Sequence, residues 1–117
     1  MKVTYKSENG KITIEFDAST HKEMVKQMAS FSEIFEEDQC GKCKGNKLRW
    51  VVRVAKDDKG KEYQYHELRC RQCGAKLPFG ILDDGTDSLF PKRKDKEGNF
   101  RGAYGWVKWN PETQVEE

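Results

Sequence analysis

The sequence is poor in apolar residues and contains no long hydrophobic run. Hydrophobic residues make up 35% of the 117 positions and charged residues 36%, and the mean hydropathy is -0.97. No apolar run approaches the roughly 20 residues of a membrane span. The start of the chain also lacks the continuous apolar stretch of a signal peptide. We therefore expect a soluble, non-secreted, cytoplasmic protein.

The chain has too few apolar residues for a large core. A protein of this length buries only about two-thirds of its unfolded surface, so a polar chain needs an additional source of stability. The four cysteines are the candidates for this role. Disulfides are rare in reducing compartments, so paired cysteines in a non-secreted protein favour a metal site over cross-links.

The sequence also lacks the motifs of common catalytic sites. It contains no glycine loop of the kind that binds phosphates, no serine or cysteine triad and no pair of carboxylates suited to acid–base chemistry. Asp83, Asp84 and Asp87 lie in a glycine-containing turn and match no nuclease motif. We therefore predict that the protein is not an enzyme.

Charge is divided unevenly along the chain. Residues 1–39 carry 5 basic and 8 acidic side chains, residues 40–110 carry 17 and 9, and residues 111–117 carry none and 3. A metal ion held by four thiolates would lower the middle charge of +8 by about 2. A basic middle between acidic ends suggests a polyanionic partner, although a mixed solvated surface explains the same pattern.

The first third of the chain has the pattern of two strands and a helix. Val3 and Tyr5 alternate with polar residues, as do Ile12, Ile14 and Phe16, and Asn9-Gly10 between them predicts a hairpin with a type I′ turn. Thr20 and Glu23 fit a helix capping box. A helical apolar stripe follows, formed by Met24, Val25, Met28, Phe31, Ile34 and Phe35. We expect this stripe to pack on the hairpin; a groove for a partner is the alternative.

The middle of the chain predicts a second hairpin. Strand-like residues run from Leu48 to Ala55 and from Glu62 to Arg69, on either side of a polar turn. Beyond Cys73 the chain is rich in turn residues, which predicts loops with one or two short strands. Trp106 and Trp109 are expected to fill the core, and the residues after Pro111 to form a frayed acidic tail.

Two C-x2-C pairs carry the clearest chemical signal. Cys40 and Cys43 form the first pair, Cys70 and Cys73 form the second, and 26 residues separate the two pairs. A C-x2-C turn places two thiolates on one side, and two such turns complete a tetrahedral four-thiolate site. Four protein ligands leave no open position, which indicates one structural Zn²⁺ ion. An iron–sulfur cluster, a redox dithiol and His66 as a substitute ligand are the alternatives.

The segment from Asp38 to Lys76 resembles a zinc ribbon, a β-hairpin fold with two cysteine knuckles. The pieces Leu68 to Leu77 and Leu89 to Lys94 also look like parts of small phage-encoded zinc-ribbon proteins that bind single-stranded DNA. Together with the predicted strands and helix, the sequence patterns predict an α+β protein with four parts. These are a β-hairpin and helix over residues 1–38, a zinc ribbon over 39–77, a loop-rich extension over 78–110 on the same core, and an acidic tail over 111–117.

Cations and aromatic rings alternate in the middle block, as binding of single strands requires. Phosphates attract cations, and exposed bases stack on rings. Strand alternation places Arg49 and Arg53 on the face opposite Trp50, and Tyr63 and Tyr65 on one face of the second strand. The predicted nucleic-acid-binding residues are Arg49, Arg53, Tyr63, Tyr65, Arg69, Arg71, Lys92, Arg93, Lys94, Phe100 and Arg101.

These observations predict binding of single-stranded nucleic acid, DNA in the first instance, in phage-like replication or recombination and with little sequence specificity. The alternative is an adaptor or inhibitor that docks on a replication, transcription or host-defence complex through the ribbon edge, the acidic helix end or an aromatic patch. The ribbon fold alone does not separate the two. A self-paired edge strand would give a homodimer.

Overall fold

A computed structural model describes all residues, 1–117, and confirms the α+β class, with one helix and eight strands. The chain divides into two compact units. The first contains Met1–Asp38 and Leu82–Phe90, and the second contains Gln39–Ile81 and Pro91–Glu117. No helix is long and apolar enough to cross a membrane.

The first unit begins with the predicted hairpin. Strand β1 (Lys2–Lys6) pairs antiparallel with β2 (Thr13–Asp17), and Tyr5 lies opposite Ile14. The predicted type I′ turn is wrong. That turn needs a positive φ at both central residues, but only Gly10 has one, at 73°. Instead, Gly10 N–H donates to the Ser7 carbonyl at 2.9 Å and Ser7 N–H to the Ile12 carbonyl at 3.0 Å, which makes a longer loop.

Helix α1 (His21–Phe35) packs on this hairpin as predicted. The Thr20 hydroxyl caps the helix by accepting a hydrogen bond from Glu23 N–H at 3.1 Å. Phe31 then carries the main contact, because its ring lies 5.6 Å from the Tyr5 ring and 5.3 Å from the Phe16 ring. Val25, also in the predicted stripe, is 62% exposed.

The acidic end of α1 has a structural use. Glu36 accepts a hydrogen bond from the Tyr5 hydroxyl at 2.5 Å and from the backbone N–H of Glu8 at 3.0 Å. Burial raises the pKa of Tyr5, and the Glu36 carboxylate raises it further. Glu36 therefore ties the end of the helix to the hairpin.

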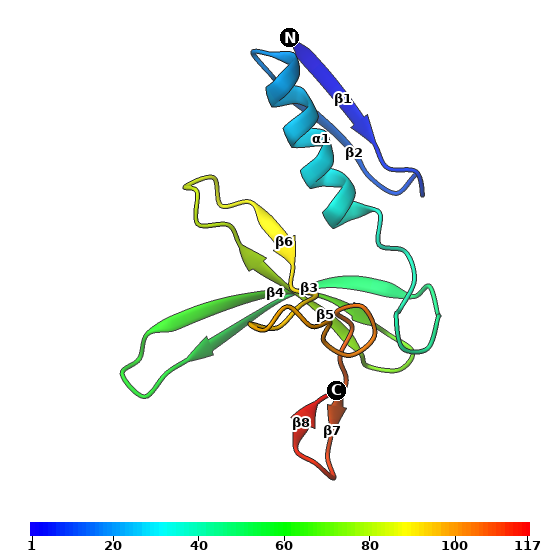
Figure 1. Cartoon of the computed structure of the whole chain (residues 1–117), viewed down its shortest axis with the longest axis vertical. Coiled ribbons are helices and arrows are strands. Elements are labelled where there is room, and N and C mark those ends of the chain that lie inside the picture. Colours follow the sequence, from blue (N-terminus) through cyan, green and yellow to red (C-terminus); the bar gives the residue numbers. More distant parts are fainter. The chain divides into compact units, whose positions relative to one another are not determined.

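The second unit is built on the predicted hairpin between the cysteine pairs. Strand β3 (Leu48–Lys56) pairs with β4 (Glu62–Cys70), and Leu48 lies opposite Cys70. Strand β5 (Lys76–Ile81) extends the sheet next to β4, and β3 lies at the sheet edge. The short strand β6 (Leu89–Pro91) lies mostly in the Leu82–Phe90 segment of the first unit. Figure 1 shows the β3–β4 hairpin as the longest pair of strands.

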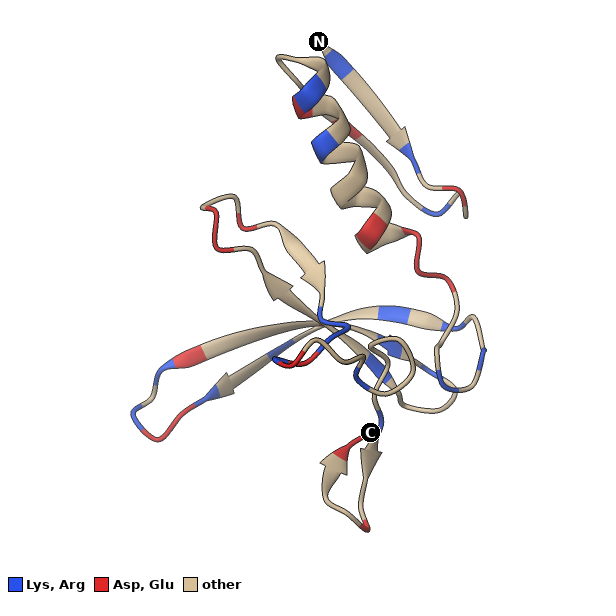
Figure 2. Ribbon diagram, in the orientation of Figure 1, with Lys and Arg blue, Asp and Glu red and all other residues tan.

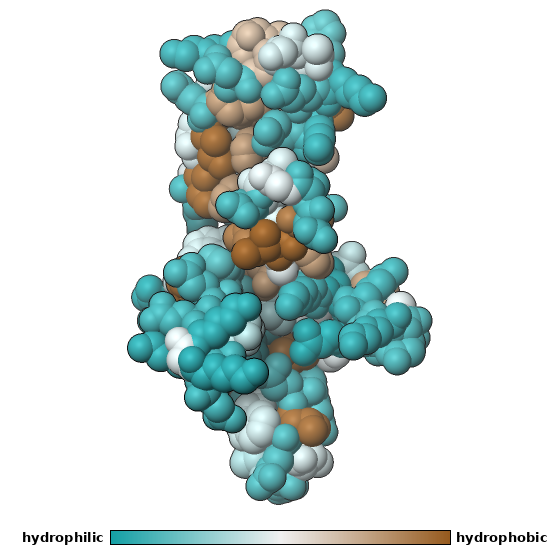
Figure 3. Space-filling view, turned by 90° about the vertical axis from the view of Figure 1, so that its left-hand side faces the viewer, coloured by the Kyte–Doolittle hydropathy of each residue, from teal (hydrophilic) through white to brown (hydrophobic).

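A small core holds this unit together. Leu77, Trp106 and Val107 are each at most 1% exposed, and Leu68 and Phe79 are also buried. Lys76 and Val107 exchange backbone hydrogen bonds of 2.9 Å, which fixes the Trp106 segment to β5. The core is small, in agreement with the composition. Hydrophilic side chains cover most of the face in Figure 3, and apolar residues gather in a few patches.

Two expectations for the C-terminal part are wrong. Trp106 is in the core, but Trp109 is 57% exposed because it lies on a short terminal hairpin instead. The acidic end is not frayed, since β7 (Trp109–Asn110) pairs with β8 (Val115–Glu116). Lys108 and Glu117 close this hairpin with backbone hydrogen bonds of 2.9 and 3.0 Å, and Glu116 binds Lys76 Nζ at 2.6 Å.

Candidate metal centre and basic face

The two cysteine pairs form two loops, here called knuckles, with the same backbone pattern. In the first, Cys40 N–H donates to the Gly45 carbonyl at 2.8 Å, and Lys44 N–H donates to the Cys40 carbonyl at 3.0 Å. In the second, Cys70 N–H donates to the Ala75 carbonyl at 2.9 Å, and Gly74 N–H to the Cys70 carbonyl at 3.1 Å. Both loops place a residue of positive φ after the second cysteine: Lys44 at 64° and Gly74 at 80°.

The knuckles bring the four cysteine sulfurs of Cys40, Cys43, Cys70 and Cys73 to within 4.8 Å of one another. The Sγ atoms of Cys40 and Cys73 are 3.6 Å apart, and those of Cys43 and Cys70 are 3.5 Å apart. Ligands at about 2.3 Å from a tetrahedral zinc stand about 3.8 Å apart, whereas a disulfide needs about 2.05 Å. The residues therefore fit one metal ion. A multi-iron cluster would hold its thiolates farther apart.

Backbone N–H groups point at three of the sulfurs. Cys40 Sγ accepts from Lys42 N–H at 3.3 Å, Cys43 Sγ from Gly45 N–H at 3.4 Å and Cys70 Sγ from Gln72 N–H at 3.4 Å. Such bonds stabilise thiolates and orient them toward a metal. Burial acts to raise the pKa of Cys70, but the backbone N–H groups of Cys73 and Gln72 outweigh it and lower the pKa to about 7. Burial raises the pKa of Cys40 to about 12.

The core packs directly against the first knuckle. A Cβ added at Gly41 would lie 2.6 Å from Trp106 Cδ1 and 2.7 Å from the Ala103 carbonyl. Glycine is therefore required here because the indole of Trp106 occupies the space of a side chain. Gly41, the second residue of the first C-x2-C motif, is therefore the point where Trp106 of the C-terminal segment packs against the metal centre. No local pattern in the sequence predicts this contact.

His66 takes no part in the cysteine cluster. The set of ligand atoms within 4.8 Å of one another contains only the four cysteine sulfurs, and His66 lies in the middle of β4, opposite Val52.

The strand register gathers five of the predicted nucleic-acid-binding residues on one face of the ribbon. Directly opposite residues share a face in an antiparallel pair. Arg53 lies opposite Tyr65, Arg49 opposite Arg69, and Ala55 opposite Tyr63. We call this side of β3 and β4 the basic face: Arg49, Arg53, Tyr63, Tyr65 and Arg69. Trp50 lies on the other side, where its ring packs 5.2 Å from the Phe79 ring.

A buried carboxylate lies under the basic face. Glu67 is 1% exposed, and its oxygens accept from Arg53 Nε at 3.2 Å and Arg69 Nε at 2.8 Å, with Lys76 Nζ at 3.9 Å. Burial acts to raise the pKa of Glu67, but the cations, Arg69 foremost, lower it overall. Sequence reasoning missed this role. The sequence signal for this role is that Glu67 alternates with Tyr63 and Tyr65 and therefore shares their face of the strand.

A hollow of about 290 Å³ opens beside Glu67. It draws residues from β3, β4, β5 and the C-terminal segment, and its lining includes Arg53, Tyr65, Glu67, Lys76, Lys92, Arg101 and Glu116. The Arg53 guanidinium stacks on the Tyr65 ring, 4.6 Å from its centre. Glu116 partly offsets the positive charge, because it binds Lys76 at 2.6 Å and lies 3.7 Å from Arg101.

A second hollow, of about 540 Å³, lies at the second knuckle. Arg49, Arg69, Cys70, Arg71 and Gly74 line it, without any carboxylate among them. Figure 2 marks in blue the basic residues of the strands and loops in this part of the ribbon.

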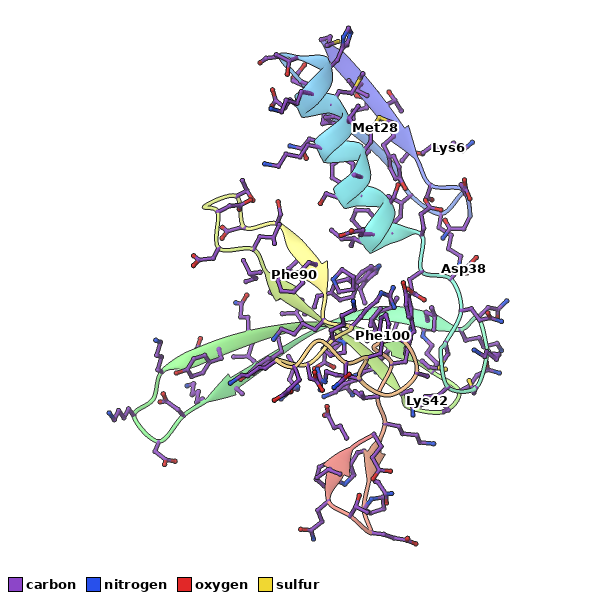
Figure 4. The ribbon with its side chains drawn as sticks, in the orientation of Figure 1. Lys6, Met28, Asp38, Lys42, Phe90 and Phe100 are labelled. Carbon is purple, nitrogen blue, oxygen red and sulfur yellow. The ribbon has the colours of Figure 1, made fainter.

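Arg93, Lys94 and Phe100 form a second cluster of cations and rings. The Lys92 backbone N–H donates to Pro78 at 2.9 Å and so attaches the basic segment to β5. Arg93 stacks on the Tyr104 ring at 4.4 Å, and Lys94 lies 4.9 Å above the Phe100 ring. Phe100, labelled in Figure 4, is 51% exposed and lies 4.9 Å from Tyr104. The contacts of Tyr104 with Arg93 and Phe100 were not predicted from the sequence.

No protein-family model, curated protein or solved structure matches this chain.

Proposed function

We propose that this chain binds single-stranded nucleic acid, DNA in the first instance, on the basic face of a ribbon held by one structural zinc ion. The observation that carries the proposal is the register of β3 and β4, which places Arg53 over Tyr65 and next to the hollow lined by Lys92 and Arg101. Cations and exposed rings then occupy one continuous surface.

The donor set supports zinc as the metal. Four thiolates in a tetrahedral arrangement suit Zn²⁺, which carries no geometric preference of its own. All four positions are taken by the chain, so no site remains for water or substrate. This supports a binding protein over an enzyme.

The chemistry of the basic face suits a flexible single strand. Tyr63 and Tyr65 are each 41% exposed, and a stacked base contributes about 1–3 kcal/mol. The bases of a duplex are already stacked and do not offer their faces to such rings. The arginines contact phosphates independently of sequence. The setting we propose, phage-like replication or recombination, is supported by the resemblance seen in the sequence.

Paired substitutions on the two faces of the ribbon test this proposal. Tyr63→Ala with Tyr65→Ala should lower the affinity for a labelled single strand at least tenfold, measured by fluorescence anisotropy with zinc-loaded protein. Val52→Ala with Val54→Ala removes exposed side chains from the opposite face of the same hairpin and should leave the affinity unchanged. Equal effects of both pairs would contradict the assignment of the face.

One observation favours the adaptor function as a second candidate. Val52 and Val54 are 59% and 54% exposed on edge strand β3. An edge strand with exposed apolar residues is a site where another chain can add a strand. An adaptor would lose its partner with the valine pair of substitutions and would bind no single strand at low salt, so the same two variants separate the candidates.

A further inference from the structure

The hollow at the second knuckle has a composition that fold stability does not explain. Arg49 and Arg69 are directly opposite in the β3–β4 pair, and like charges in that position destabilise a sheet. Arg71 adds a third guanidinium from the knuckle. We call Arg49, Arg69 and Arg71 the tri-arginine hollow.

Carboxylates balance little of the positive charge of this hollow. Arg69 binds Glu67 at 2.8 Å, but that carboxylate is shared with Arg53 and Lys76. Arg49 and Arg71 are exposed and make no ion pair. Two guanidinium groups are therefore available to an anion, next to a third that Glu67 holds in position.

We propose that the tri-arginine hollow binds the terminal phosphate monoester of a nucleic-acid strand. The inference rests on the proposed function and adds to it a preference for a strand end. A terminal phosphate carries a charge of about -1.5 to -2 at neutral pH and three free oxygens. An internal phosphodiester carries a single charge on two free oxygens. Three guanidinium groups match the terminal group, because each donates through paired N–H groups.

The hollow also lies where the end of a bound nucleic-acid strand would be expected. Arg49 is the second residue of β3 and Arg69 the last but one of β4, so the basic face ends at this point. Tyr63 and Tyr65 lie near the start of β4, toward the turn end of the hairpin. A nucleic-acid strand whose bases stack on the tyrosines, and which follows the basic face toward the second knuckle, has its terminus at the tri-arginine hollow.

Three strands of about ten thymidines test the inference by anisotropy with zinc-loaded protein: one with a 5′-phosphate, one with a 3′-phosphate and one with hydroxyl groups at both ends. We expect one of the two phosphorylated strands, whichever presents its phosphate at the hollow, to bind about tenfold more tightly than the hydroxyl strand at low salt. Arg49→Gln with Arg71→Gln should remove this difference. Lys2→Gln with Lys22→Gln deletes the same charge in the first unit and should preserve it.

The results separate this inference from the proposed function. Equal binding of all three strands would overturn the terminal-phosphate site and leave single-strand binding in place. Absence of binding by every strand would overturn both. The arginines also stand beside the negatively charged metal centre, so zinc release to a chelator is measured for the same variants. Faster release together with an unchanged end preference would show that the arginines serve the metal centre, and would overturn the inference.

Discussion

Replacement of Glu67 by glutamine removes the charge under the basic face with little change of shape. The carboxylate accepts from Arg53 at 3.2 Å and from Arg69 at 2.8 Å. A hydrogen bond to a charged group contributes about 1.5–3 kcal/mol, but the two arginine side chains are 44% and 35% exposed, so water replaces part of each contact. Since glutamine also keeps one acceptor oxygen, we expect Glu67→Gln to lower the free energy of unfolding by about 2 kcal/mol.

Thermal unfolding measures this loss. For a domain the size of the second unit, about 2 kcal/mol corresponds to a decrease in melting temperature of about 10 °C. The matched control is Glu62→Gln on the same strand. Its partner Lys56 is 3.6 Å away, and both side chains are more than half exposed, so the change should cost less than about 1 kcal/mol. Equal melting temperatures for Glu67→Gln and Glu62→Gln would refute the structural role of Glu67.

Acid should weaken the same contacts. The pKa of Glu67 is lower in the folded protein than in the unfolded chain, so the unfolded state takes up its proton first as the pH falls. The stabilisation is therefore complete at neutral pH, above the unfolded pKa of about 4.3, and is lost as the pH falls through the folded pKa. Glu67→Gln should show a smaller loss of stability than the unchanged protein below about pH 4.

Three further substitutions test the metal centre, its support and the basic face. Cys43→Ser should abolish binding of one zinc equivalent and unfold the central hairpin; an unchanged circular dichroism spectrum in the presence of chelator would contradict this. Gly41→Ala should cost about 1–3 kcal/mol by overpacking, because its Cβ meets Trp106 Cδ1 at 2.6 Å; a normal melting temperature would mean that the indole moves freely. Lys92→Glu should weaken single-strand binding and make it less sensitive to salt, whereas an unaltered salt dependence would remove Lys92 from the site.

The parts of the fold that depend on local patterns could be predicted from the sequence. The spacing of the cysteines locates both knuckles, and the alternation of Val3, Tyr5, Ile14 and Phe16 locates the first hairpin, because these signals lie within a few residues of each other. The exact turn was missed since Asn9-Gly10 fits several loop lengths. The hairpin bonds of Ser7 then selected the longer one.

Features that depend on long-range contacts could not be predicted. Alternation assigns Arg53 to one face of β3 and Tyr65 to one face of β4, but only the register places them together. The burial of Glu67 follows from β5 and Lys76 lying next to it, and the packing of Trp106 on Gly41 joins residues far apart in the chain. Trp109 has the same residue type as Trp106 but lies on a terminal hairpin that composition does not reveal.

Binding of a labelled single strand at two salt concentrations, with an unlabelled duplex as competitor, tests the central claim most directly. If the basic face contacts about three phosphates, the logarithm of the affinity should fall with the logarithm of the salt concentration at a slope of about -2, and the duplex should compete poorly. Absence of binding at low salt, or equal competition by the duplex, would contradict the account.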